Sequence, residues 1–251
     1  MKLENMPASR QKLRKIAVFD IDGTIFRSSL TIALINGLVE EGIFPRKAQK
    51  EVEKDYLAWL DRRGTYDQYL AQVVRIYYRY IDGCRVRDVD RVIKKVVKRE
   101  RDRVYVYTRD LVRKLKKEGY FLLTISGSPT YIVSHFARYM GFDVHYGSEL
   151  FVHNGMFSRE EPNRDSYQNK EKVLKHFLAD APFRVDLKHS IAVGDSSTDI
   201  SMLKMVGQPI AFNPDNILAR HAAKKKWKIV VERKNVIYDI RAHRFLNNSH
   251  S

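Results

Sequence analysis

Two aspartates separated by a single residue, Asp20 and Asp22, directly follow a short apolar run at residues 15–19. Two carboxylates this close together repel each other unless a cation or a proton compensates their charge. Asp195 and Asp199 add two more carboxylates after a second apolar run. Oxygen ligands of this kind suit Mg²⁺, which binds a few carboxylates together with water and substrate phosphate. The sequence therefore predicts a magnesium site.

The same residues could carry out phosphoryl transfer. Asp20 can attack phosphorus and form an aspartyl phosphate, while Asp22 can protonate the leaving alkoxide and later accept a proton from water. Phosphoryl transfer otherwise needs mainly positioning and charge neutralisation. The Ser126 hydroxyl and the Gly127 backbone N–H could hold the phosphate near a helix start. Lys170, at the start of a predicted helix, is the candidate cation for the same phosphate.

These residues must be positioned by strands. The sequence contains five short apolar runs that could form such strands. These runs cover residues 15–19, 121–125, 190–193, 209–212 and 228–231. Helical patterns separate the runs, and strands that alternate with helices predict a parallel sheet flanked by helices. The carboxyl ends of parallel strands share one edge, where the binding crevice lies. We therefore expect Asp20, Ser126 and Asp195 to converge there.

Turn and capping residues mark the connections between these elements. We expect a helix at 108–118, and Ser128 is predicted to cap another that has Pro129 in its first turn. A hairpin is predicted at 149–157, where Asn154-Gly155 supplies the turn. A further helix is predicted at 170–178.

The segment between the first two strands has a different character, with helical patterns and few strand signals. Two apolar stripes have helical spacing: Tyr69, Val73, Ile76, Tyr77 and Tyr80, and then Val89, Val92, Ile93, Val96 and Val97. We expect a catalytic core at residues 1–27 and 106–240, a helical insert at 28–105, and a loose polar tail at 241–251.

Four segments resemble the motifs of the haloacid dehalogenase superfamily of phosphatases in order and spacing. They read FDIDGTIF, SGSP, NKEKVL and GDSSTDISML. The resemblance implies an α/β fold, a doubly wound parallel sheet with an inserted α-helical cap of the C1 type. It implies a nucleophile, Asp20, and an acid/base, Asp22. Magnesium would be held by Asp20, the Asp22 carbonyl and Asp195, and phosphate by Ser126, Gly127 and Lys170. Thr24 and Asp199 would support the site, with Asp199 holding the metal or orienting Lys170.

Two later segments, SELFVHNGMFS and GQPIAFNPDNILARHAAKKKWKIV, resemble the phosphoserine-phosphatase-like branch, subfamily IB. The resemblance has two departures. Phosphoserine phosphatases carry a glutamate shortly after the first motif, whereas residues 27–31 here contain no acid. Thr198 stands where those enzymes usually place asparagine. Both departures argue against phosphoserine as the substrate.

Charge and composition restrict which cellular compartment and which binding partners we expect for this protein. The 251 residues include 46 Lys plus Arg against 30 Asp plus Glu, a net charge of +16. A basic surface attracts anions such as phosphorylated metabolites, anionic lipid headgroups or nucleic acid, or it serves solubility alone. The lone Cys84 excludes an internal disulfide. The first 15 residues contain no apolar run long enough for a signal peptide, and the sequence contains no apolar run of about 18 residues, so we expect a cytoplasmic protein without a transmembrane segment.

The sequence as a whole predicts a magnesium-dependent phosphatase acting on a phosphate monoester of a small metabolite or lipid. One alternative is a phosphotransferase that passes the same intermediate to an alcohol. Another is a basic protein that binds nucleic acid or a membrane surface, against which the intact acidic motifs argue. Arg75 and Arg79 are candidates for reading a substrate anion.

Overall fold

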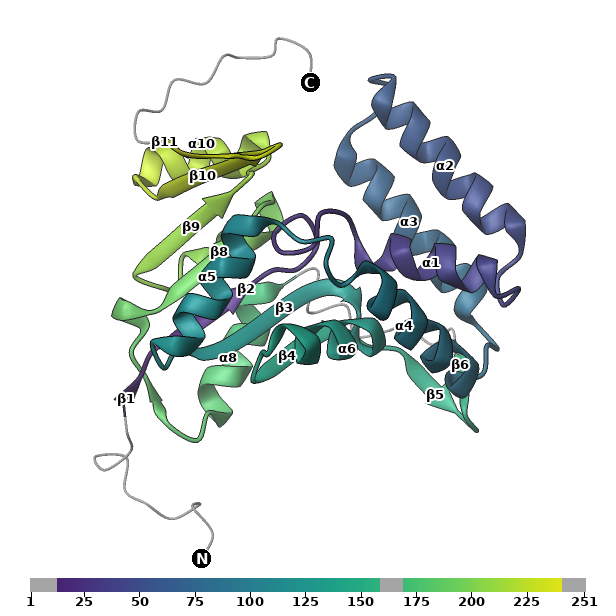
Figure 1. Ribbon diagram of the computed structural model, residues 1–251, viewed down its shortest axis with the longest axis horizontal. Helices are drawn as coiled ribbons and strands as arrows, with labels where there is room; N and C mark the ends of the chain where they lie inside the picture. The colour runs from purple at the N-terminus through teal and green to yellow at the C-terminus, as the bar shows by residue number, and fades with distance from the viewer. Residues whose placement is uncertain (1–12, 159–168, 241–251) are drawn as a thin grey trace, which may run out of the picture.

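The computed structural model describes residues 13–158 and 169–240 of the chain. The start of the predicted core, up to residue 12, and the predicted tail at 241–251 lie outside the described residues. The described part consists of a central sheet with helices on both faces and a group of four helices at one end (Figure 1). No helix among the described residues has the length and apolar composition needed to cross a lipid bilayer.

The central sheet has seven strands in the order β11-β10-β9-β8-β2-β3-β4. The strands are β2 (Ile16–Phe19), β3 (Phe121–Pro129), β4 (Val144–Ser148), β8 (Ile191–Gly194), β9 (Gln208–Phe212), β10 (Lys228–Arg233) and β11 (Val236–Ile240). Neighbours run parallel, except that β11 is antiparallel to β10. The chain adds β3 and β4 on one side of β2 and later adds β8 to β10 on the other. Ligands bind at such a reversal, beyond the carboxyl ends of the strands.

Each face of the sheet has its own core, because side chains alternate along β2. The covering helices are α5 (Val106–Lys117), α6 (Thr130–Met140), α8 (Lys170–Asp180), α9 (Ile200–Leu203) and α10 (Asn216–Lys225). Ala17 and Phe19 pack with α5 and α6, whereas Ile16 and Val18 pack with α8, α9 and α10. Helices on both faces of a mostly parallel sheet confirm the predicted doubly wound α/β fold.

Four helices form the insert between β2 and β3. They are α1 (Leu30–Glu40), α2 (Arg46–Leu60), α3 (Tyr66–Ile81) and α4 (Val86–Glu100). Both predicted stripes are buried, except that Tyr80 is only partly covered. A hydrogen bond of 2.9 Å between Asp90 on α4 and His135 on α6 ties the insert to the core. We keep residues 28–105 as its proposed extent.

Two short strand pairs lie outside the central sheet. One is the parallel pair of β1 (Leu13–Arg14) and β7 (Arg184–Val185). The other is the predicted hairpin, confirmed as β5 (Phe151–His153) and β6 (Met156–Ser158). Its turn residues Asn154 and Gly155 have φ of +49° and +76°, the left-handed backbone that a tight hairpin requires.

Several local predictions were wrong in detail. The helix expected from residue 108 begins two residues earlier, and Thr108 lies inside it with its hydroxyl bonded to the Thr24 carbonyl at 2.8 Å. Strand β3 continues to Pro129, and Ser128 does not cap α6, because its hydroxyl is used elsewhere. Strands β4 and β11 were not predicted, since β4 carries no apolar run and the apolar pattern of β11 is interrupted by Asp239.

Candidate active site

Three carboxylates from two neighbouring strand ends form a compact acidic cluster. Asp20 follows β2, and Asp195 and Asp199 follow β8. One oxygen from each lies within 4.8 Å of the others. The expected convergence of the first and last strand ends is therefore present. Each strand reaches the cluster because its apolar side chains are buried in the two cores.

Lys170 bridges two of these carboxylates, Asp20 and Asp199. Its ammonium donates to Asp20 Oδ1 at 2.6 Å and to Asp199 Oδ1 at 2.5 Å, and its side chain is 3% exposed. Lys170 is the first residue of α8, and Asn169 caps that helix by accepting the Lys172 N–H at 2.9 Å. The cap fixes the helix start and with it the place of the lysine. A buried ammonium with two anionic partners is held in a single geometry.

Asp199 owes its orientation to the turn that precedes it. Its Oδ2 accepts the backbone N–H groups of Asp195 and Ser196, both at 3.0 Å, which turns Oδ1 toward Lys170. Gly194 makes this approach possible, because a Cβ there would lie 2.4 Å from Asp199 Cγ. Asp199 therefore faces Lys170 and accepts its ammonium, and its supporting role in the reaction stays a prediction.

The loop after β2 is fastened to the loop after β8 through Thr24. The Thr24 hydroxyl donates to Asp195 Oδ1 at 2.9 Å. Gly23 lies beside the same carboxylate with φ of +78°, and a Cβ there would fall 2.2 Å from Asp195 Oδ2. Only glycine fits this position without displacing Asp195.

Asp22 points away from the acidic cluster, toward β3 and the insert. Its Oδ1 accepts the Leu30 N–H at 2.7 Å, and its Oδ2 accepts the Ser128 hydroxyl at 2.5 Å. The Ser126 hydroxyl is a weaker third donor at 3.4 Å. Sequence reasoning missed Ser128 because SGSP also fits a helix cap, and it could not foresee the bond to Leu30.

The predicted phosphate-binding residues differ in their access to solvent. Gly127 and Lys170 line a cavity of about 600 Å³ together with Asp20, Asp22 and Asp195. Ser126 is fully buried, accepts the Ser128 N–H at 3.1 Å and does not line this cavity. Its contact with phosphate stays a prediction.

The cavity lies between the insert and the sheet edge. Tyr66, one of the insert aromatics that the sequence offered as possible pocket residues, lines the cavity, whereas sequence reasoning missed the lining residues Trp59, Asn213 and Asp215. The candidate anion readers Arg75 and Arg79 are absent from the lining. Arg79 forms a salt bridge with Glu51 on α2 at 2.9 Å.

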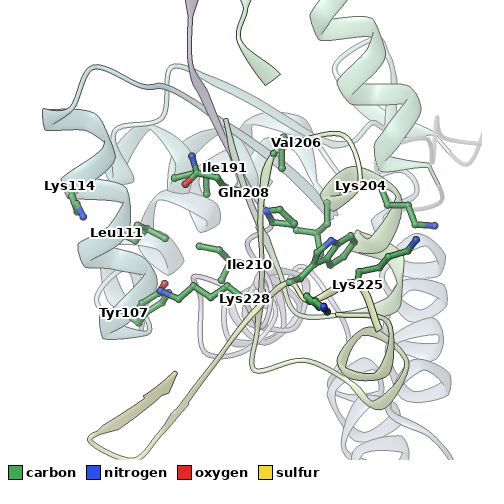
Figure 2. A pocket seen from close by; sticks show the side chains of 15 residues that line it. Tyr107, Leu111, Lys114, Ile191, Lys204, Val206, Gln208, Ile210, Lys225 and Lys228 are labelled. Carbon is green, nitrogen blue, oxygen red and sulfur yellow. The ribbon is translucent and has the colours of Figure 1, made fainter. Parts of the chain in front are cut away.

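A larger cavity of about 1020 Å³ lies at the opposite edge of the sheet (Figure 2). It contacts Ile191, Gln208 and Lys228, the first residues of β8, β9 and β10. In the described part of the chain its lining holds five lysines and no carboxylate, so these residues neither favour a cation nor supply a carboxylate nucleophile. Chemistry rather than size therefore identifies the smaller cavity as the candidate active site.

Burial sets the electrostatics of the acidic cluster. It raises the pKa of Asp20 to about 7, although Lys170 acts in the opposite direction. Burial, followed by Asp20 and Asp199, raises the pKa of Asp195 well above its usual range. Burial disfavours the charge of Lys170, but Asp199 and Asp20 outweigh it and raise the pKa of the ammonium. Asp22 also has a raised pKa through burial, which the Ser128 hydrogen bond opposes.

The raised pKa values of Asp20, Asp22 and Asp195 indicate that too little positive charge lies near these carboxylates. Within the described residues, Lys170 is the only cation that forms a salt bridge with Asp20, Asp22, Asp195 or Asp199. The donors are hard carboxylate oxygens, and a cation among them would relieve the repulsion that raises their pKa values. The residues present therefore fit a divalent metal ion.

Comparisons with known proteins agree with this chemistry. A family model described as haloacid dehalogenase-like hydrolase matches residues 17–204. The chain is 23% identical over 226 residues to a phosphoserine phosphatase of Methanocaldococcus jannaschii, which covers 90% of this chain and 96% of that protein. It is 25% identical over 245 residues to a Mycobacterium tuberculosis protein named "Probable phosphatase", covering 92% of this chain and 83% of that one.

Among solved structures, a protein of unknown function from Bordetella pertussis superposes with a TM-score of 0.72. The identity is 18%, and the match covers 87% of this chain and 98% of the other. At that identity the match establishes a shared fold.

Proposed function

The chain belongs to the haloacid dehalogenase-like hydrolases, and from that premise we propose that it is a magnesium-dependent phosphatase. It would hydrolyse a phosphate monoester through an aspartyl phosphate on Asp20. One observation carries the proposal: Asp20 lies at a strand end, buried, with its carboxylate held by Lys170 at 2.6 Å and opening into the cavity between insert and core.

In the first half-reaction, a carboxylate oxygen of Asp20 attacks phosphorus, and the bond between phosphorus and the ester oxygen breaks. Asp22 gives its proton to that oxygen, so the alcohol leaves neutral. Burial raises the pKa of Asp22, which favours the protonated form that this step requires.

In the second half-reaction, water attacks the phosphorus of the aspartyl phosphate. Asp22 accepts a proton from that water, the bond between phosphorus and Asp20 breaks, and inorganic phosphate is released. Lys170, the backbone N–H of Gly127 and the Ser126 hydroxyl would hold the phosphoryl oxygens. Magnesium, held by Asp20, the Asp22 carbonyl and Asp195, would neutralise negative charge on the phosphate.

The proposal predicts that phosphate release depends on magnesium. With a panel of phosphate monoesters, we expect saturable activation by Mg²⁺ and loss of activity with excess chelator. The cation should also stabilise the fold, because it binds the native cluster and not the unfolded chain. A concentration of about 100 times Kd corresponds to about 2.7 kcal/mol. Released phosphate and thermal unfolding with and without Mg²⁺ measure both effects.

Full turnover in chelator would contradict the metal requirement. Stabilisation by Mg²⁺ without hydrolysis of any ester would instead indicate a metal-binding protein with another activity. Adding alcohol acceptors to the same assay distinguishes a hydrolase from a phosphotransferase, since the latter forms a new ester in place of inorganic phosphate.

A second prediction concerns Ser128, whose hydroxyl holds Asp22 at 2.5 Å. Ser128→Ala is expected to lower kcat by about 10- to 100-fold with a smaller effect on KM, because the acid loses its orientation. The alkaline limb of the pH profile should move to higher pH, since the lost hydrogen bond lowers the pKa of Asp22.

Ser134→Ala is the matched control, because the Ser134 hydroxyl bonds only to the Tyr131 carbonyl on the same helix. It should leave kcat and the pH profile unchanged. A fall in kcat without any movement of the profile would mean that Ser128 acts only through packing.

A further inference from the structure

The wall of the active-site cavity that the insert contributes is largely apolar. Trp59 of α2 and Leu70, Val73 and Val74 of α3 line it, with Tyr66 at the start of α3. No residue of α1 to α4 with a charged side chain lines the cavity in the described part of the chain. Apart from the hydroxyls of Ser29, Thr31 and Thr65, a part of a substrate that extends from the phosphate toward the insert therefore meets hydrocarbon and aromatic rings.

The aromatic part of this wall is already assembled. The rings of Trp59 and Tyr66 have centroids 5.0 Å apart, and the Trp59 ring stacks on Tyr69 at 6.4 Å. Burial, followed by Asp195 and Asp22, raises the pKa of the Tyr66 phenol, so this hydroxyl stays neutral. A wall held by ring contacts needs little ordering when a ligand arrives.

Outside the catalytic loops, the core side of the cavity adds the apolar Ile217, the neutral amides Asn213 and Asn216, and the carboxylate of Asp215. Ile217, at the start of α10, lines the cavity and is 59% exposed. Asp215 is the lining carboxylate outside the catalytic loops, and both its oxygens are occupied, by the Leu218 N–H at 2.7 Å and the Ser197 N–H at 2.6 Å. Among the described residues, Lys170 is the only basic one in the lining, and it is held by Asp20 and Asp199.

This lining disfavours a zwitterionic leaving group. The carboxylate of an amino-acid phosphate would lose water against apolar side chains without gaining a cation, because the one basic residue in the described lining, Lys170, already has two anionic partners. That loss of water costs free energy. An apolar alcohol gains from the same burial. The cavity volume of about 600 Å³ is within the range of sites for drug-sized ligands.

We propose that the substrate is a phosphate monoester of an uncharged, apolar alcohol, whose chain or ring binds against Trp59, Tyr66, Leu70 and Val74. This inference rests on the proposed function and adds the class of leaving group. The same apolar surface could receive an alkyl chain or an aromatic ring, and the experiment separates these two sources.

The test compares esters whose alcohols have similar acidity, so that the chemical step is matched. Ethyl, butyl, hexyl and octyl phosphate form the chain series, benzyl and 2-phenylethyl phosphate form the ring series, and O-phosphoserine is the zwitterionic comparison. With Mg²⁺, kcat/KM should rise by about fourfold per added methylene, the ratio that corresponds to about 0.8 kcal/mol per buried CH₂. O-phosphoserine should fall below ethyl phosphate, and therefore about 1000-fold or more below octyl phosphate.

Wall variants test whether the named residues cause the preference. Leu70→Gln and Val74→Thr place polar atoms in the wall, and each should lower the ratio of octyl to ethyl phosphate kcat/KM by about 3- to 10-fold. Leu57→Gln is the matched control: Leu57 lies on α2, is 48% exposed and does not line the cavity. It should leave the ratio unchanged.

Binding of ethyl- and octylphosphonate, measured by calorimetry, separates this inference from the proposed function. Hydrolysis of every ester with a flat or falling dependence on chain length would overturn the inference alone. Tighter binding of octylphosphonate without hydrolysis of any ester would overturn the phosphatase and leave the apolar subsite standing. Neither hydrolysis nor a chain-length effect on binding would overturn both.

Discussion

Asp20→Asn is expected to reduce phosphate release by about 10⁴-fold or more, because an amide cannot attack phosphorus. Asparagine has nearly the size of aspartate, so the packing around β2 should be kept. The nucleophile is the one group in the proposed reaction for which no neighbouring residue can substitute. Release of inorganic phosphate at saturating Mg²⁺ measures the loss.

The same variant should be at least as stable as the wild-type protein in chelator at pH 8. Burial raises the pKa of Asp20 to about 7, above its unfolded value of 3.8. The folded state therefore keeps the proton that the unfolded state loses, and stability falls as pH rises between these two values. Above about pH 7 the full cost of the charge is present, and asparagine removes it.

Asp110→Asn is the matched control, since Asp110 lies on α5, is 54% exposed and does not line the cavity. It should leave turnover and thermal unfolding unchanged. Appreciable turnover by Asp20→Asn in a correctly folded sample would eliminate the aspartyl-phosphate mechanism.

Lys170→Met is expected to lower kcat/KM by about 10³-fold and to destabilise the protein by about 3–5 kcal/mol. The stability loss follows because two buried carboxylates, Asp20 and Asp199, lose their shared cation. The activity loss follows because the phosphoryl group loses a positive charge that would lie beside it. Chemical denaturation in chelator and initial rates in Mg²⁺ measure the two losses separately.

A double substitution separates the structural from the catalytic role of Lys170. Adding Asp199→Asn to Lys170→Met removes one of the unpaired charges, so stability should largely return while activity stays low. Lys175→Met is the control, because Lys175 lies on the same helix, is 64% exposed and pairs only with Glu171. If activity returned together with stability, Lys170 would be a structural residue alone.

The acidic cluster was predictable because each part follows from a local pattern. Asp20 and Asp195 come directly after apolar runs, and parallel strands bring their carboxyl ends to one edge. Lys170 was the least distinctive residue, since a lysine at a helix start is common. Its place became predictable only from the order of the four motifs together.

The partners of Asp22 could not be predicted in the same way. One of them is the backbone N–H of Leu30. Every residue except proline carries such a group, so the residue type at position 30 does not reveal this hydrogen bond. The other, Ser128, lies in a segment that fits a helix cap equally well. The cavity wall was also out of reach, because helical spacing says which face is buried and not whether it faces a core or a ligand.

The hydrogen bond between α1 and Asp22 links proton transfer at Asp22 to movement of α1. The carboxylate that exchanges protons with leaving group and water also accepts the first N–H of α1, and Thr31 of that helix contacts Ser128 at 2.9 Å. An ionised acceptor holds an N–H more strongly than a protonated one. By thermodynamic reciprocity, displacing α1 must shift the proton affinity of Asp22 as much as protonation loosens α1. The protonation state of Asp22 during the reaction and the position of the insert are thus coupled through the hydrogen bond between Asp22 and the Leu30 N–H.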